Sequence, residues 1–458
     1  MKRNHIFKKA LALMMAVVML ALAGCRGGGE SSESSGGAQK SGESQQAEKA
    51  EKPVVTVCMD LDVGSEGQSS QLLRDLVREY DPEFKDSYKL EIEAVPGIGG
   101  ERESTLDRIR VEVMAGKGPD LFLCRSPRAA NPNLMPPRER EVGLFQYPKA
   151  LMKRHMFLPL DGYIENAKYM EWDKLYPQIM AAGKNDEGQL ILPIGWSMNF
   201  VRFDAQSYTP AGELPMTFDE MLKSQDPGII TAVCFSGLAE SLGPVADYEN
   251  DVPAFTKEEL TAHLDALIES DSRRTPELEE SLGDYAPVTF NRMNASNFTQ
   301  YDPDSVLLPH CNRDGGATAY ITTFGAVNIN SEAPEGAFEI LELLLSKEAQ
   351  QDSELLSWNA GTPVHMELLK SKEKINAPFN RGNMYVKSWG LTDYNYDQLQ
   401  SLIKQINAVD FVTPVHHELS ELYSPYDSSP YAQAETKEER EKLVEETYRN
   451  IEMMLAEA

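Results

Sequence analysis

"VEVMAGKGPDLFLC", residues 111–124, is the stretch that decides the fold. A helical apolar pattern ends at Gly116, Pro119 prevents the helix from continuing, and the apolar run at 120–124 has the length of a buried strand. A phosphate-binding loop would need a strand before the glycines, a helix after them, and a Ser or Thr after the lysine. Lys117 is followed by glycine, so the stretch predicts a joint from helix to strand.

The residues before this joint alternate between strand and helix. β-branched or alternating apolar residues indicate the strands, and apolar residues at helical spacing indicate the helices. Ser104 and Asp107 resemble a capping box and predict a helix start. Such alternation is typical of a mainly parallel α/β sheet. The predicted elements are strands at 53–61 and 88–95 and helices at 69–84 and 104–116.

The N-terminus has the features of an export signal. Four basic residues precede an apolar run at 10–23, whose 14 residues are too few to span a membrane. The run ends in "LAGC", residues 22–25, which resembles a bacterial lipobox. That resemblance implies removal of residues 1–24 and a lipid thioether on Cys25, which would anchor the chain to the membrane without spanning it. The alternative is an ordinary secretory signal with a cysteine nearby.

Residues 25–52 predict a flexible tether, because they are Gly, Ser, Glu, Gln and Lys with almost no apolar side chain. The 458-residue chain has a formal net charge of −28, which becomes −32 without residues 1–24 and their four basic side chains. Such a charge argues against a nucleic-acid partner. Roughly 400 folded residues suggest two or more lobes with their own cores.

Reactive and metal-binding patterns are missing from the sequence. No HExxH, GxSxG or GxGxxG occurs, and no His or Cys set has metal-ligand spacing. We therefore predict no catalytic residue, no metal and no cofactor, and not an enzyme. Buried free thiols are the favoured state of the four later cysteines, although an exported protein could also form a disulfide. They are Cys58, Cys124, Cys234 and Cys311.

Six stretches follow one another in an order that is typical of one family. They are "AGKGPDLFL" (115–123), "LPLDGYIE" (158–165), "GQLILPIGWSMNFVRFD" (188–204), "LPMTFDEML" (214–222), "FGAVNINSEAPEGAFEILELLLSKEAQQ" (324–351) and "GTPVHMEL" (361–368). Behind a lipobox, they resemble the extracellular solute-binding proteins (family 1 type, oligosaccharide-binding branch) of bacterial ABC importers. The resemblance covers most of 53–370 and the amphipathic C-terminal helix. Residues 225–310 and 371–433 match no motif of the family.

The resemblance implies a two-lobe, periplasmic-binding-protein-like α/β fold (type II) with a ligand cleft between the lobes. We place lobe 1 at 53–193 plus 312–357 and lobe 2 at 194–311 plus 358–458. The implied protein is a monomer anchored outside the cytoplasm. It captures a solute, a sugar or an oligosaccharide, by lobe closure and delivers it to ABC permease subunits. The alternatives are a ligand sensor that feeds a membrane signalling partner, or an anchored hydrolase.

Candidate ligand contacts lie at strand ends and at the crossing between the lobes, where such folds bind ligands. Each has a structural alternative: core packing for the tryptophans, a turn or helix cap for the aspartates, and a surface ion pair for the arginine. The candidates are Asp60, Asp62, Arg125, Ser126, Trp196, Ser197, Asn199, Trp358 and Asn359.

Overall fold

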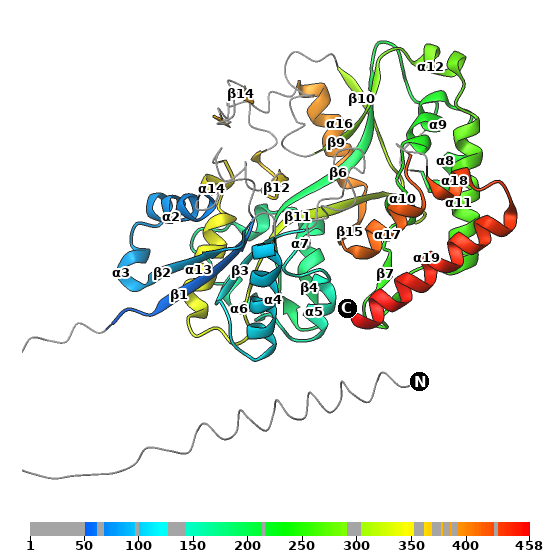
Figure 1. The fold of residues 1–458 in the computed structure, drawn as a ribbon. Helices are drawn as coiled ribbons and strands as arrows, with labels where there is room; N and C mark the ends of the chain where they lie inside the picture. The colour runs from blue at the N-terminus through cyan, green and yellow to red at the C-terminus, as the bar shows by residue number, and fades with distance from the viewer. Residues whose placement is uncertain are drawn as a thin grey trace, which may run out of the picture. The chain divides into compact units, whose positions relative to one another are not determined.

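The computed structural model of the protein describes most of the chain after residue 50. Lys52–Ala458 form one compact unit (Figure 1). None of the described helices combines the length and the apolar character needed to cross a bilayer. The predictions for Cys25, the signal and most of the tether lie outside the described residues. Those residues are 51–61, 68–96, 100–126, 143–212, 216–290, 304–351, 361–368, 377–378, 385–386, 392–425 and 429–458.

The N-terminal strands and helices confirm the predicted alternation. β1 lies between β2 and β3 and is parallel to both. The short apolar run of β3 is buried at four of its five positions, as expected for a strand covered on both faces. The elements are β1 (Val54–Asp60), α2 (Gln68–Tyr80), α3 (Phe84–Ser87), β2 (Lys89–Ala94), α4 (Gly100–Met114) and β3 (Leu121–Arg125).

The joint between α4 and β3 is a glycine turn, as predicted. Gly116 has φ +72° and Gly118 has φ +100°, a region that favours glycine over residues with a Cβ. The predicted helix start is wrong. α4 begins at Gly100, and Ser104 lies within its second turn, where its hydroxyl donates to the Glu101 carbonyl oxygen at 3.0 Å.

Within the described residues, the main sheet has nine strands and is mixed: the first three strands and the β11–β15 pair are parallel, as predicted for the whole sheet, and the other pairings are antiparallel. Its path is β10-β6-β11-β3-β1-β2, with β9 and β12 also paired to β6 and β15 paired to β11. β6 is antiparallel to all four of its partners, and β11 is antiparallel to both β3 and β6. These strands are β6 (Leu192–Asp204), β9 (Tyr285–Phe290), β10 (Ser305–Pro309), β11 (Ala317–Val327), β12 (Thr362–Pro363) and β15 (Ile406–Phe411).

Helices and short hairpins make up the rest of the described chain. The helices are α5 (Pro148–Lys153), α6 (Asp161–Ile164), η2 (Trp172–Lys174), α7 (Pro177–Met180), η3 (Ala181–Gly183), α8 (Phe218–Lys223), α9 (Pro227–Cys234), α10 (Leu238–Leu242), α11 (Lys257–Ser272), α12 (Pro276–Leu282), α13 (Pro334–Leu344), α14 (Lys347–Gln351), α16 (Asp393–Lys404), α17 (Pro414–Leu422), α18 (Pro430–Gln433) and α19 (Lys437–Glu457). The short strands are β4 (Lys184–Asn185), β5 (Gly188–Gln189), β7 (Ala246–Asp247), β8 (Val252–Pro253), β13 (Ala377–Pro378) and β14 (Tyr385–Val386).

Two hydrophobic clusters form the core. The first cluster holds β1, β3 and the helices around them, and the second holds α8 to α11, α17 and α19. β6 contributes to both, because Trp196 and Phe200 belong to the first cluster and Val201 and Phe203 to the second. In Figure 1, β6 runs from the N-terminal strands toward α9. Residues 399–411, assigned to lobe 2 from the sequence, contribute Leu, Ile and Phe side chains to the first cluster, and the lobe boundaries stay a prediction.

The four described cysteines are free and buried, which confirms the favoured prediction. Cys58 lies on β1 and Cys124 on β3, inside the first cluster. Burial raises the pKa of both thiols well above the ordinary value, so they stay protonated and pack as small apolar side chains.

Candidate functional site

The carboxyl end of β3 meets three other strands at one level. Ser126, the residue after β3, donates its backbone N–H to the Thr322 carbonyl oxygen of β11 at 3.0 Å. The next residue of β11, Thr323, pairs with Gly195 of β6. Trp196, which follows Gly195, pairs with Thr362 of β12. We call Ser126, Thr322, Trp196 and Thr362 the crossing row, because four strands meet here on the stretch of β6 that leads from one hydrophobic cluster to the other.

Asp60, the last residue of β1, is held by the protein itself. Its Oδ1 accepts a hydrogen bond from Arg102 Nη1 at 2.8 Å, and its Oδ2 accepts one from the Leu144 backbone N–H at 2.7 Å. Both charged side chains are buried. A buried charge is costly unless it has a partner of opposite charge, and each supplies that partner for the other. The carboxylate thus joins β1, α4 and the segment before α5. The structure therefore gives Asp60 a structural role, its ligand contact stays a prediction, and Asp62 lies outside the described residues.

The two residues predicted at the end of β3 differ in exposure. Arg125 is half-buried at the last position of the strand. Ser126 is buried, and its hydroxyl has no hydrogen-bond partner. Ser126 is therefore a buried donor and acceptor that the described protein leaves unsatisfied.

Trp196 lies in the first cluster with 0% of its surface exposed. Its Nε1–H donates to the Pro363 carbonyl oxygen at 3.1 Å, and its ring meets Tyr176 edge-on with the centroids 5.8 Å apart. In this conformation Trp196 offers no face to a solute, so the structure supports the core alternative. Ser197, the next residue of β6, is also buried.

Asn199 belongs to a buried polar group that includes two residues not predicted from the sequence. Its Nδ2 donates to Glu240 Oε1 at 2.8 Å, and His310 Nδ1 lies 2.8 Å from Glu240 Oε2. His310 follows β10 and is only 2% exposed, and Glu240 lies on α10. In the sequence, the only sign of Glu240 and His310 is that each stands beside an apolar run, in a region without family motifs.

Four buried polar atoms, two in the crossing row and two about three residues further along β6, have no hydrogen-bond partner among the described residues. They are Ser126 Oγ, Thr362 Oγ1, Asn199 Oδ1 and His310 Nε2. Most buried polar groups in native proteins are satisfied, and an unsatisfied one costs about 1–3 kcal/mol. Buried atoms of this kind are completed by a polar solute or by ordered water. The row therefore becomes our candidate ligand site.

Three other predictions remain without structural description. Trp358, Asn359 and Cys25 lie outside the described residues. Within the described part of the chain, no group of three or more His, Cys, Asp or Glu side chains could hold a metal ion.

A second layer of buried polar residues lies on β11 and β15. Lys149 Nζ pairs with Asp410 Oδ1 at 2.9 Å, and His416 Nε2 lies 3.8 Å from Asp410 Oδ2. The His416 ring meets Tyr320 edge-on with the centroids 5.5 Å apart. Burial lowers the pKa of His416 to about 4, so its imidazole is neutral at pH 7. Burial also raises the pKa of the Tyr320 phenol, which therefore stays protonated.

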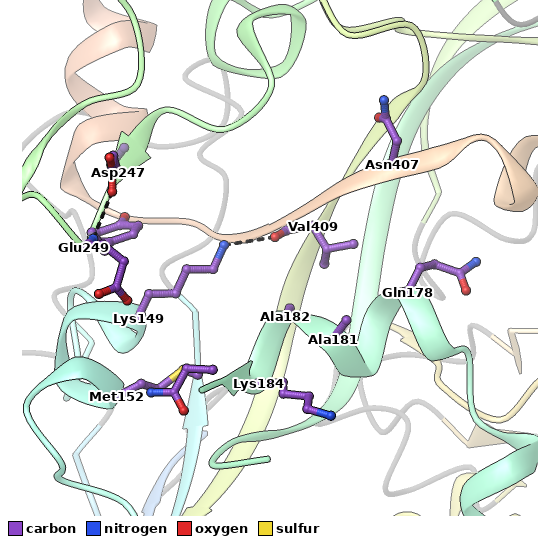
Figure 2. Close-up of a pocket in the computed structure, with 13 residues that line it drawn as sticks. Lys149, Met152, Gln178, Ala181, Ala182, Lys184, Asp247, Glu249, Asn407 and Val409 are labelled. Atoms are coloured by element: carbon purple, nitrogen blue, oxygen red, sulfur yellow. Dashed lines mark hydrogen bonds between the residues drawn. The ribbon is translucent and has the colours of Figure 1, made fainter. Parts of the chain in front are cut away.

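A pocket of about 470 Å³ lies apart from the crossing row (Figure 2). Its walls come from α5, α7, η3, β4 and β15 and from the β7–β8 hairpin. None of the predicted site residues lines it. In Figure 2, the Lys149 ammonium turns toward the Val409 carbonyl oxygen, to which it donates at 3.1 Å.

Comparison with known proteins identifies the fold. No family model and no curated protein sequence matches this chain. An extracellular solute-binding protein family 1 structure from Alicyclobacillus acidocaldarius matches with a TM-score of 0.53 and 12% identity, over 88% of this chain and 99% of that chain. The sugar-binding protein MalE from Xanthomonas citri matches with a TM-score of 0.53 and 10% identity, over 88% of this chain and 98% of that chain.

A third solved structure, a de novo designed cysteine esterase, matches with a TM-score of 0.52 and 12% identity, over 89% of this chain and 98% of that chain. At such low identity the likeness establishes the fold alone. The chain has the predicted two-lobe α/β fold of periplasmic binding proteins. Since a designed esterase shares this fold, the fold does not by itself decide between binding and catalysis.

Proposed function

We propose that this chain is a membrane-anchored solute-binding protein, which captures a sugar or an oligosaccharide by lobe closure and delivers it to ABC permease subunits. The observation that carries the proposal is the fold. Two solved structures named as binding proteins match 88% of this chain. A ligand favours a closed arrangement only by making contacts that the open one lacks. A solute that contacts groups on both sides of the crossing would meet that condition.

The unsatisfied groups at the crossing row suit a sugar. A hydroxyl group both donates and accepts, so a sugar suits the Ser126 and Thr362 hydroxyls of the crossing row. His310 Nε2 can take part in either role, depending on its tautomer. These groups lie on or beside β3, β6, β10 and β12. β10 and β12 pair with β6 directly, and β3 is joined to β6 through β11. The absence of a nucleophile and base pattern from the sequence supports binding without turnover.

A thermal-shift screen tests the solute. Lys52–Ala458 would be screened against mono- and oligosaccharides, peptides, polyamines and amino acids. A ligand at about 100 times its dissociation constant adds about 2.7 kcal/mol to the free energy of unfolding, so a sugar should raise the melting temperature visibly. A hit from another class would reject the carbohydrate assignment. Silence across the panel would favour the sensor or hydrolase alternatives, which a turnover assay on glycans and peptides would separate.

The variants Ser126→Ala and Thr362→Val test the site. Each removes a buried hydroxyl that has no protein partner, so the empty protein should keep its melting temperature. If the solute satisfies these hydroxyls, its dissociation constant should rise about tenfold, the cost of one lost hydrogen bond. Unchanged affinity in both variants would remove the crossing row from the ligand site.

Membrane anchoring is tested separately on the full chain. Mass spectrometry of the mature N-terminus should find a lipid thioether on Cys25, and Cys25→Ser should release the protein from the membrane fraction. A Cys25→Ser variant that stays with the membrane would reject the lipoprotein assignment without touching the solute assignment.

A further inference from the structure

The strand β12 can form few ladder hydrogen bonds of its own. It consists of two residues, Thr362 and Pro363, which pair with Trp196 and Gly195 of β6. Proline has no backbone N–H, so only one of the two residues can donate to a neighbouring strand. A strand this short needs other bonds to fix its position, and that position matters because β12 carries Thr362 of the crossing row.

Two side chains from other elements supply such bonds. The Trp196 indole N–H donates to the Pro363 carbonyl oxygen at 3.1 Å. The second side chain is that of Gln350 on α14, whose Oε1 accepts the Val364 backbone N–H at 3.0 Å. Val364 directly follows β12, and its carbonyl oxygen accepts the Tyr176 backbone N–H at 3.0 Å. The chain is therefore held on both sides of Val364, where the ladder to β6 has ended.

The same amide of Gln350 also holds β6. Its Nε2 donates to the Ile194 carbonyl oxygen at 3.3 Å and to the Leu344 carbonyl oxygen at 2.9 Å. Ile194 lies on β6, two residues before Trp196, and Leu344 is the last residue of α13, where carbonyl groups lack a partner within the helix. Gln350 is 0% exposed. One buried side chain thus ties β6 and the end of α13 to the residue that follows β12.

We propose that Gln350 is a positioning residue of the candidate ligand site, which sets the place of β12 against β6 and, through it, the place of the Thr362 hydroxyl. A glutamine suits this task because its amide carries an acceptor for one backbone N–H and two donors for two carbonyl groups. An ionised glutamate would set an oxygen against those carbonyls, and a methionine offers neither function. The effect on solute binding rests on the proposed function, whereas the effect on β12 does not.

Hydrogen exchange in the empty full chain, followed by NMR, tests the effect on β12. Gln350→Met keeps the length of the side chain and removes its hydrogen bonds. The Val364 amide and the Trp196 indole N–H should then exchange about tenfold faster, the factor for one lost hydrogen bond. The indole is the decisive reporter, because its partner is Pro363, so it follows the strand itself.

A matched variant and a reference within the fold serve as controls. Gln351→Met, the same substitution at the half-buried next residue of α14, should leave both reporter protons unchanged. In Gln350→Met, the acceleration at the reporters should exceed that at the backbone amides of β1 and β3. Equal acceleration everywhere would mean that Gln350 only stabilises the whole fold. Unchanged exchange at the reporters would mean that β12 keeps its place without Gln350, and either result would overturn the proposal.

Titration with maltotriose tests the consequence for binding. Gln350→Met should raise the dissociation constant about tenfold in the parent chain and should add no further loss to a chain with Thr362→Val, because the hydroxyl that it positions is then gone. Additive losses would mean that Gln350 does not act through Thr362 and would overturn that part of the proposal. If the parent chain does not bind maltotriose, the sugar assignment fails for this probe, and hydrogen exchange alone decides the role of Gln350.

Discussion

At the scale of residues, the partner of a charged side chain decides its role. Asp60 stands at a strand end, where a ligand contact is plausible, yet Arg102 and the Leu144 N–H engage both of its oxygens. Asn199 stands on β6 and keeps one buried oxygen free. Both residues were chosen from their places on strands. Their partners lie 42 and 84 positions away along the chain for Asp60, and 41 positions away for Asn199. Local patterns carry no information about such partners.

His416 should make the stability of the protein depend on pH. Its pKa is about 4 in the folded chain, because burial disfavours the charged form, and about 6.5 when unfolded. The folded pKa is the lower one, so the contribution is present above pH 6.5 and is lost as the pH falls toward 4. Between pH 7 and pH 5 the loss is about 2 kcal/mol.

His416→Gln isolates this effect. His416 Nδ1 accepts the Thr413 backbone N–H at the start of α17, and glutamine can accept the same bond as part of a capping box. Urea unfolding at pH 7 and pH 5 should show a smaller loss of unfolding free energy in the variant. His263, whose pKa burial also lowers to about 4, remains in both proteins as an internal reference. An equal loss in variant and parent would contradict the assignment.

At the scale of elements, helix starts are fixed by caps that the sequence shows only in part. Thr256 at the start of α11 forms a full capping box with Glu259, and Thr217 with Glu220 does the same for α8. Ser104 and Asp107 have the same three-residue spacing between a hydroxyl and an acidic side chain, but α4 begins at Gly100, four residues before Ser104. The motif predicts a helix correctly and places its first turn wrongly, because Arg102, upstream of the motif, is buried and pairs with Asp60 from the first turn of α4.

Thr256→Ala and Ser104→Ala should therefore differ. Thr256→Ala removes a side chain that caps α11 and should lower the free energy of unfolding by about 1 kcal/mol. Ser104→Ala, inside α4, should change it by no more than a few tenths of a kcal/mol, since alanine is the better helix former. Chemical denaturation of the two variants checks this. A larger loss in Ser104→Ala would mean that Ser104 does cap the helix.

At the scale of the whole molecule, β6 joins the two hydrophobic clusters, and Trp196 lies on the part of β6 that belongs to the first. Trp196→Ala should lower the unfolding free energy of the empty protein by about 3–5 kcal/mol, the usual cost of deleting a buried aromatic side chain. Trp196→Phe keeps most of the packing and loses the bond to Pro363, so it should cost less. A near-normal melting temperature for Trp196→Ala, together with weaker solute binding, would instead assign the residue to the ligand site.

The fold could be predicted further than the site. The strands and helices from residue 54 to residue 125 follow from apolar periodicity and glycine turns, which are local. The antiparallel pairing of β6 with β9, β10 and β12 joins residues between 82 and 168 positions apart, and no local pattern reports it. The site depends on that pairing. Ser126 and Asn199 were predicted from their places on strands, whereas Glu240 and His310 became visible only once α10 and β10 were placed beside β6.

The burial of Cys58, Cys124, Cys234 and Cys311 has a practical consequence for observing the molecule in motion. A chain that begins at Lys52 contains no other cysteine, so it presents no reactive thiol at its surface. A single cysteine introduced on α12 and another on α2 would then be the only positions that accept maleimide dyes. Energy transfer between the two fluorophores would follow the movement of one lobe against the other while a solute arrives and leaves.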